Sequence, residues 1–185
     1  MAHPTSNQTI GPFWHGLADP AMQDLTRLGA EGRRIVLAGR LVDGDGTPVT
    51  DACIEIVQAS PPPSERFPGW GRCATDGEGR FRFVTLAPAT DGEDAPHIAV
   101  LIHARGLLKP LVTRAYFEGE PKNERDPLLR AVDPDRRPTL IAKQRAEDAW
   151  HFEIVLQGAG ETVFLEIGAL TSPTDGTRRQ PVIAA

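Results

Sequence analysis

Histidine is the residue type most often used as a metal ligand or general base, and its copies in this chain are scattered. They are His3, His15, His97, His103 and His151. His97 and His103 fall in one apolar segment with the character of a strand, where six residues of separation place them roughly 20 Å apart. They cannot hold one metal ion together, and we expect His97 to be a hydrogen-bonded core histidine. No Ser-His-Asp or Cys-His arrangement is defined by spacing.

Two glycine-containing motifs could bind ions or phosphate. Asp43-Gly44-Asp45-Gly46 resembles part of a calcium loop, but an EF-hand loop needs further oxygen ligands and flanking helices. Gly158-Ala159-Gly160 has no following helix that would cradle a pyrophosphate. We therefore interpret both motifs as turns between strands.

The two cysteines, Cys53 and Cys73, lie in apolar, strand-like stretches and match no zinc spacing. We expect free, buried thiols in a reducing cytoplasm. The opening MAHPTSNQTIGPFW has neither the cationic nor the apolar region of a signal peptide, which also favours a cytoplasmic protein.

The bulk composition is that of an ordinary globular domain, with 185 residues, 40% hydrophobic and 24% charged. A formal net charge of -5 argues against a nucleic-acid partner, which needs a basic face. No apolar run approaches the roughly 18–20 residues needed to span a bilayer, so no membrane partner is expected.

Short β-branched and aromatic runs, separated by glycine and proline, predict a mainly β, single-domain β-sandwich. The turn 76–79 predicts a hairpin into RFRFVTL, with Phe81 and Phe83 on one side of the strand. The segment HIAVLIHA predicts a central strand buried on both faces. The expected strands are Arg33–Val42, Cys53–Ala59, Arg80–Leu86, His97–Ala104, Leu111–Phe117, His151–Gln157 and Thr162–Ile167.

One short helix is expected at Arg137–Ala149, where Leu140, Ile141 and Gln144 follow helical spacing. The domain is expected to span residues 1–168, including an N-terminal arm. Residues 169–185 carry turn formers without periodicity and are expected to form a C-terminal tail.

Four stretches resemble the chains of protocatechuate 3,4-dioxygenases, in the intradiol ring-cleavage dioxygenase family. Residues 5–13, TSNQTIGPF, are similar to the S-Q-T-x-G-P-[FY] opening, and GRCATDGEGRFRF at 71–83 resembles G-R-x-x-T-D-x-x-G-x-[FYW]. APHI at 95–98 with HARG at 103–106 resembles the α-subunit form A-P-H-I…F-A-R-G. RRPTLIAK at 136–143 and QGAGETVF at 157–164 resemble R-R-x-T-L-I-A-K and Q-G-x-G-E-T-V-F. The resemblance implies a sandwich of the transthyretin-like, intradiol dioxygenase type.

The family's catalytic chain holds non-haem Fe(III) with two tyrosinates and two histidines, the latter in R-P-A-H-I-H. At that motif this chain has His97 at the position of the first histidine but Ala99 at the position of the second. Its one tyrosine, Tyr116, lies in a segment that resembles a non-ligand part of the family. Phe67 is all that the region of the first tyrosine offers. Because hard Fe(III) needs anionic oxygen ligands, the resemblance implies the α subunit, with no metal ligand or catalytic residue of its own. The iron would be bound by a partner β subunit, in a hetero-oligomer of α/β pairs.

The resemblance also implies a substrate pocket at the α/β contact, with Gly11, Pro12 and Arg105 as substrate-binding residues. Gly11-Pro12 would form a wall for a flat aromatic ring, or only a turn. Arg105 would serve a carboxylated catechol, or an inter-chain salt bridge. Trp14 and Trp70 are expected to be interface or core anchors. The implied reaction, within the β-ketoadipate pathway of aromatic catabolism, is cleavage of protocatechuate by O2 to 3-carboxy-cis,cis-muconate.

Two other interpretations stay open at the level of sequence. One is a non-catalytic ligand-carrier or scaffold sandwich of transthyretin type. The other is a self-sufficient intradiol enzyme such as a catechol 1,2-dioxygenase, which the single tyrosine disfavours.

Overall fold

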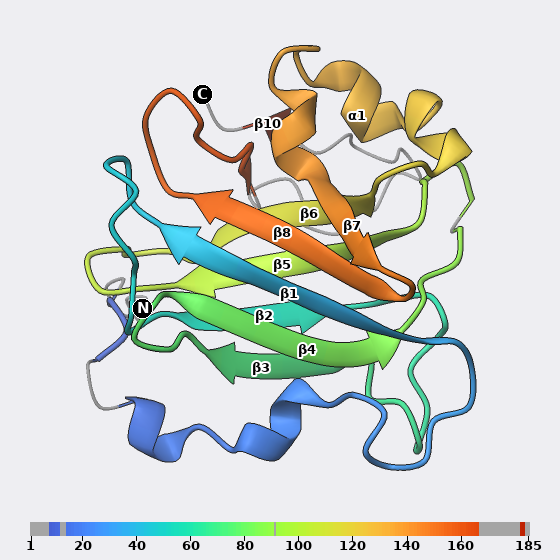
Figure 1. Ribbon diagram of the computed structural model, residues 1–185, viewed down its shortest axis with the longest axis horizontal. Coiled ribbons are helices and arrows are strands. Elements are labelled where there is room, and N and C mark those ends of the chain that lie inside the picture. The colour runs from blue at the N-terminus through green and yellow to red at the C-terminus, as the bar shows by residue number, and fades with distance from the viewer. Residues whose placement is uncertain (1–7, 12–13, 91, 167–181, 184–185) are drawn as a thin grey trace, which may run out of the picture.

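The chain folds into two sheets that face each other across an apolar core (Figure 1). The computed structural model describes residues 8–11, 14–90, 92–166 and 182–183. The strands are β1 Arg34–Val42, β2 Cys53–Val57, β3 Trp70–Ala74, β4 Arg80–Leu86, β5 His97–His103, β6 Leu111–Phe117, β7 Ile141–Ala146, β8 Ala149–Val155, β9 Leu165–Glu166 and β10 Val182–Ile183.

The front sheet has the strand order β7-β8-β1-β4 and the back sheet the order β3-β2-β5-β6. A short parallel contact between β6 and β7 joins the two, with Tyr116 opposite Ile141 and Phe117 opposite Ala142. The β1–β8 pair is also parallel, and the other pairs are antiparallel. The mainly β sandwich expected from the sequence is confirmed.

Alternation along the strands builds the core. In β4, Phe81 and Phe83 are buried while Arg80 and Arg82 are exposed, as predicted. Fully burying a Leu, Ile or Phe side chain contributes about 1.5–3 kcal/mol relative to leaving it exposed. The inward-facing side chains include Leu37, Leu41, Phe83, Phe152, Ile154, Ile54, Ile56, Ile98, Val100 and Ile102.

The prediction that β5 is buried on both faces is wrong. Its burial alternates, with Ile98, Val100 and Ile102 buried and the residues between them only partly covered. His97, Ala99, Leu101 and His103 therefore line the outer face of the back sheet.

The turn at 76–79 is not a hairpin between paired strands. It connects β3, which pairs with β2 in the back sheet, to β4, which pairs with β1 in the front sheet. The turn itself forms locally, because the Asp76 carboxylate accepts hydrogen bonds from the backbone N–H groups of Glu78 and Arg80, both at 2.8 Å. A local turn signal could not distinguish a hairpin from a crossing between sheets.

The predicted helix at Arg137–Ala149 is also wrong. Only Arg137–Leu140 is helical, as the 3₁₀ turn η4, and the chain then forms β7, a turn at 147–148 and β8. Hydrogen-bonded pairing of β7 with β6 and β8 stabilises the strand conformation of these residues. This stabilisation outweighs the helical spacing of their apolar side chains. The other 3₁₀ turns are η1 Trp14–Leu17, η2 Pro20–Gln23 and η3 Pro121–Glu124.

The α-helix is α1, Pro127–Ala131, and the sequence carries its start signal. Asp126 caps it by accepting a hydrogen bond from Leu129 N at 2.9 Å, and proline occupies the first helical position. This helix contributes Leu128 and Leu129 to a second apolar cluster, whose other members are Ala95, Tyr116, Val132, Leu140 and Val163.

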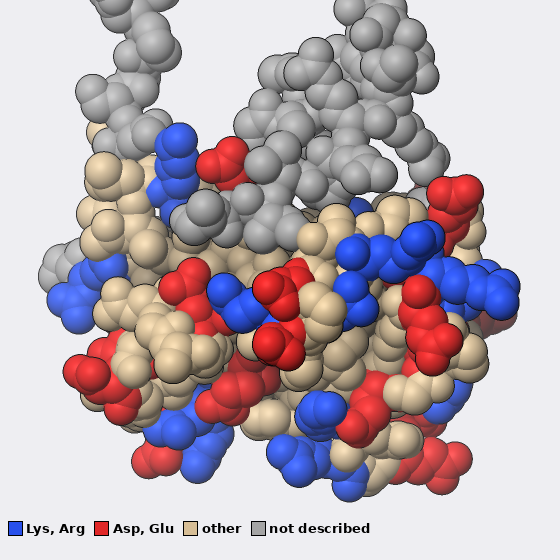
Figure 2. Space-filling model, turned by 90° about the horizontal axis from the view of Figure 1, so that it is seen from above, with Lys and Arg blue, Asp and Glu red and all other residues tan. Residues whose placement is uncertain are grey.

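In the C-terminal segment, Val182–Ile183 pairs antiparallel with β9. Residues 167–181 lie outside the described residues, so the division into a domain up to 168 and a tail stays a prediction. Among the described residues, no helix is both long and apolar enough to cross a membrane. On the face shown in Figure 2, acidic and basic side chains are interspersed.

Candidate functional site

The candidate site lies where β5 ends, at residues 104–106. Arg105 follows the strand, and its guanidinium Nε forms an ion pair with the Asp51 carboxylate. The Arg105 side chain remains 64% exposed and that of Asp51 only 21%. The ion pair therefore positions the guanidinium on the surface without enclosing it.

The N-terminal segment is fastened to this strand end. Thr9 Oγ1 donates a hydrogen bond to the Ala104 carbonyl (3.2 Å) and accepts one from Gly106 N (3.0 Å). Two segments almost a hundred residues apart in sequence, those of Gly11 and Arg105, are thus brought to one corner of the sandwich.

Gly11 is exposed, and a Cβ built there would meet no atom within 4 Å in the described part of the chain. Pro12, its predicted companion, lies outside the described residues. Trp14 anchors the next turn, because its indole Nε1 donates to the Asp51 carbonyl at 3.1 Å.

Next to this corner, the outer face of the back sheet holds a charged group that sequence reasoning missed. The Glu55 carboxylate accepts a hydrogen bond from Arg72 Nε at 2.8 Å and lies 3.5 Å from His103 Nε2. The His103 and Arg72 side chains lower the pKa of Glu55 to about 2. Arg72 also lies over the Trp70 ring, 5.3 Å from its centroid. The signal in the sequence was a lone carboxylate inside the apolar strand CIEIV.

Phe67, from the region of the family's first tyrosine, is buried in the core at 2% exposure. No metal ligand was expected in this region, and His97 was expected to be a hydrogen-bonded core histidine. The His97 Nδ1 donates to the Ala95 carbonyl at 2.8 Å. Burial and the nearby Arg114 charge lower the pKa of His97.

The single tyrosine is unsuited to hold a metal. Tyr116 is fully buried, and its hydroxyl donates to Asp126 Oδ1 at 3.0 Å while accepting from Arg114 Nη1 at 3.2 Å. Burial raises the pKa of Tyr116 well above its usual range, so a tyrosinate would not form near neutral pH.

A ferric site of two tyrosinates and two histidines does not fit these residues, since one histidine and one protonated phenol stand near the R-P-A-H-I-H position. Within the described ranges, no three His, Cys, Asp or Glu side chains come close enough to share a metal ion.

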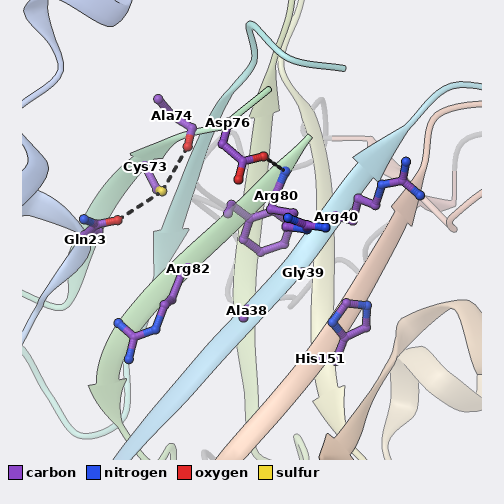
Figure 3. Close-up of a pocket in the computed structure, with 11 residues that line it drawn as sticks. Gln23, Ala38, Gly39, Arg40, Cys73, Ala74, Asp76, Arg80, Arg82 and His151 are labelled. Carbon is purple, nitrogen blue, oxygen red and sulfur yellow. Dashed lines mark hydrogen bonds between the residues drawn. The ribbon is translucent and has the colours of Figure 1, made fainter. Parts of the chain in front are cut away.

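A separate hollow lies on the outer face of the front sheet (Figure 3). Among its lining residues, Arg80 pairs with the Glu78 carboxylate at 3.1 Å, and Arg40 Nε donates to the Glu78 carbonyl at 3.0 Å. His151 lies 3.1 Å from the Glu153 carboxylate. The hollow is lined by Gln23, Ala38, Gly39, Arg40, Cys73, Ala74, Asp76, Arg80, Phe81, Arg82 and His151.

Comparison with known proteins identifies the class. Residues 10–158 match the family model described as "Dioxygenase", so the chain belongs to this dioxygenase family. Within it, the chain is 36% identical to the protocatechuate 3,4-dioxygenase alpha chain of Burkholderia cepacia, covering 88% of this chain and 97% of that one. It is also 36% identical to the alpha chain of Pseudomonas putida, over 88% of this chain and 96% of the relative. The family predicted from the four sequence stretches is confirmed.

Other relatives extend the picture. The beta chain of protocatechuate 3,4-dioxygenase from Burkholderia cepacia is 30% identical, over 84% of this chain and 76% of the beta chain. The solved dioxygenase domain of a carbohydrate-binding fusion from Streptomyces sp. SirexAA-E aligns with a TM-score of 0.62 and 26% identity, over 85% and 100% of the two chains. Hydroxyquinol 1,2-dioxygenase from Pseudomonas putida DLL-E4 shares the fold, with a TM-score of 0.57 and 19% identity. The alignment covers 71% of this chain and 58% of the hydroxyquinol dioxygenase chain. The intradiol dioxygenases of this family are iron enzymes.

Proposed function

We propose that this chain is the α subunit of a protocatechuate 3,4-dioxygenase and that a β subunit holds the iron. The assembled enzyme would cleave the protocatechuate ring between its two hydroxylated carbons with O2, giving 3-carboxy-cis,cis-muconate. The ferric ion of the β subunit would supply the activation of the catechol ring. The α chain would contribute pocket walls, charge and assembly, and would have no activity alone.

One observation carries the proposal. The chain matches alpha chains at 36% identity over nearly their full length, yet the residues around His97 cannot form the family's ferric site. Its one tyrosine is a buried hydrogen-bond donor rather than an available ligand. A chain that keeps the fold but lacks the ligands fits a non-catalytic subunit.

The corner formed by residues 8–11 and 104–106 is the part that we assign to the pocket. Arg105 is held by Asp51 but stays largely exposed, so its remaining guanidinium nitrogens can reach a carboxylate brought by substrate or by the β chain. Gly11 follows Thr9 by two residues and is exposed, and we propose that Gly11-Pro12 supplies a flat wall for an aromatic ring.

We also assign the protein to the cytoplasm and residues 1–168 to its folded domain, with residues 169–185 as a tail. Cys53 and Cys73 are both free and buried, which suits a reducing compartment.

The test is reconstitution with a β chain. This chain, a β chain retaining both tyrosines and both histidines, and the co-expressed pair are compared for protocatechuate-dependent O2 uptake and product formation. We expect one co-eluting complex with activity and no turnover by this chain alone. A stable chain that neither binds β nor raises its activity would contradict the proposal and favour a carrier sandwich.

A further inference from the structure

The region around His97 holds a cation in an unexpected place. In the pairing of β5 with β6, His97 lies opposite Tyr116 and Ala99 lies opposite Arg114. Residues 97 and 99 both lie on the outer face, about 7 Å apart along the strand. Two histidines at these positions could reach a common ion, and Arg114 is the neighbour of the second position.

Arg114 is already bound to the oxygen atoms of this region. Its Nη1 donates to Asp94 Oδ2 and to the Tyr116 hydroxyl, both at 3.2 Å. The Arg114 side chain is 21% exposed and that of Asp94 is 31% exposed. The Arg114 guanidinium is thus hydrogen-bonded to the Asp94 carboxylate and the Tyr116 hydroxyl, the oxygen groups that an ion beside His97 would need as ligands.

The rest of the network is closed as well. The Tyr116 hydroxyl donates a hydrogen bond to Asp126, a fully buried carboxylate that also accepts one from Ala95 N at 2.8 Å. The rings of Tyr116 and His97 lie 5.5 Å apart, so the histidine packs directly on this network. Asp94 Oδ2, the Tyr116 hydroxyl and both Asp126 carboxylate oxygens thus each accept a hydrogen bond from a group of the protein.

We propose that Arg114 is a built-in cation that takes the place of a metal ion and keeps metals away from the His97 cluster, defined as Asp94, His97, Ala99, Arg114 and Tyr116. A guanidinium is permanently charged and cannot withdraw by losing a proton. In a half-buried setting, its repulsion of a metal cation is less screened than in water. The chain is thereby metal-free through an added charge as well as through missing ligands.

The proposal is tested by restoring the second histidine with and without the cation. Co2+ binding is measured for wild type, Ala99→His, and the double variant Ala99→His/Arg114→Gln, by titration, equivalents bound per full-length chain and visible absorption. We expect Ala99→His to bind Co2+ no more tightly than wild type. The double variant should bind at least 10-fold more tightly and show the absorption of nitrogen- and oxygen-ligated Co2+.

Ala99→His/Arg40→Gln is the matched control, because it loses the same charge on the outer face of the opposite sheet and should behave as Ala99→His. If removal of Arg114 impairs folding, Ala99→His/Arg114→Met keeps the aliphatic stem and gives the same comparison. Equal Co2+ affinity with and without Arg114 overturns the proposal, whether both variants bind tightly or neither does. The role of Arg114 depends on the geometry around His97 and not on a β subunit, so it can fail while the proposed function stands.

Discussion

At the scale of single residues, Arg105 is the subject of our most specific functional proposal. The sequence motif singled it out, and the structure gives it an exposed guanidinium tied to Asp51 beside the N-terminal segment. The expectation left two roles open, contact with substrate and a salt bridge to β. The observed salt bridge is made within the chain, so it removes neither role.

Arg105→Ala in the α/β complex should lower kcat/KM for protocatechuate roughly 10- to 100-fold, because a hydrogen bond to a charged group is worth ~1.5–3 kcal/mol. Arg105→Lys should recover part of this, since an ammonium lacks the planar fork. Rates are measured per bound iron in complexes of verified size.

Asp51→Asn is the matched control, because it removes the same ion pair but keeps the guanidinium group in the chain. It should retain most of the activity. If Asp51→Asn and Arg105→Ala lose activity equally, or if Arg105→Ala keeps the wild-type rate per iron, Arg105 is architecture and not part of the pocket.

Glu55 should make the stability of the fold depend on pH. Its pKa is lowered to about 2 in the folded chain, so its contribution is fully present above the unfolded value near 4.5 and is lost as pH falls toward 2. Wild type should lose about 1–3 kcal/mol of unfolding free energy over that window relative to Glu55→Gln, measured by urea denaturation. Parallel pH profiles of the two proteins would show that the His103 and Arg72 contacts do not stabilise the carboxylate.

At the scale of elements, Asp126 connects three parts of the second cluster. It caps α1 and accepts hydrogen bonds from the segment before β5 and from Tyr116 of β6. Asp126→Ala should cost about 3 kcal/mol or more, because it removes a cap and leaves buried donors without an acceptor. Thermal and urea unfolding measure this loss.

The comparison is Asp19→Ala, which removes the cap of η2 at an exposed position and should cost no more than about 1 kcal/mol. Similar losses for the two variants would show that Asp126 acts as an ordinary surface cap.

The same scale shows what could be predicted from the sequence. Strands 80–86 and 111–117 were predicted to the residue, because alternation and flanking turns define them locally. The helix at 137–149 was wrong because pairing with β6 and β8 is a long-range effect that local spacing does not contain. Asp126-Pro127 carried a valid start signal for α1, and the prediction overlooked it.

In the candidate site, too, local sequence carried some features and tertiary packing determined the others. The motifs singled out Gly11 and Arg105, whose role in a pocket stays a prediction, whereas the meeting of their segments through Thr9 depends on tertiary packing. Glu55 and Arg72 became visible as a pair only through the register of β2 and β3. Pairing across strands is what a single sequence does not display.

At the scale of the whole molecule, the chain combines a dioxygenase fold with residues that do not form the family's ferric site. Loss of the ligands and retention of the sandwich make sense if the fold serves as a wall and a contact surface for a second chain. The partly exposed outer face of β5, next to the Arg105 corner, is where such a contact would bring two chains close to one pocket.

The most direct test of this account is the iron content and visible spectrum of the full chain expressed alone and together with a β chain under iron-replete conditions. Expressed alone, the chain should contain no stoichiometric iron and be colourless, because Tyr116 is the only tyrosine and stays protonated. The complex should carry one iron per α/β pair and the colour of tyrosinate bound to Fe(III). An isolated chain that is coloured and holds one iron per molecule would contradict the account.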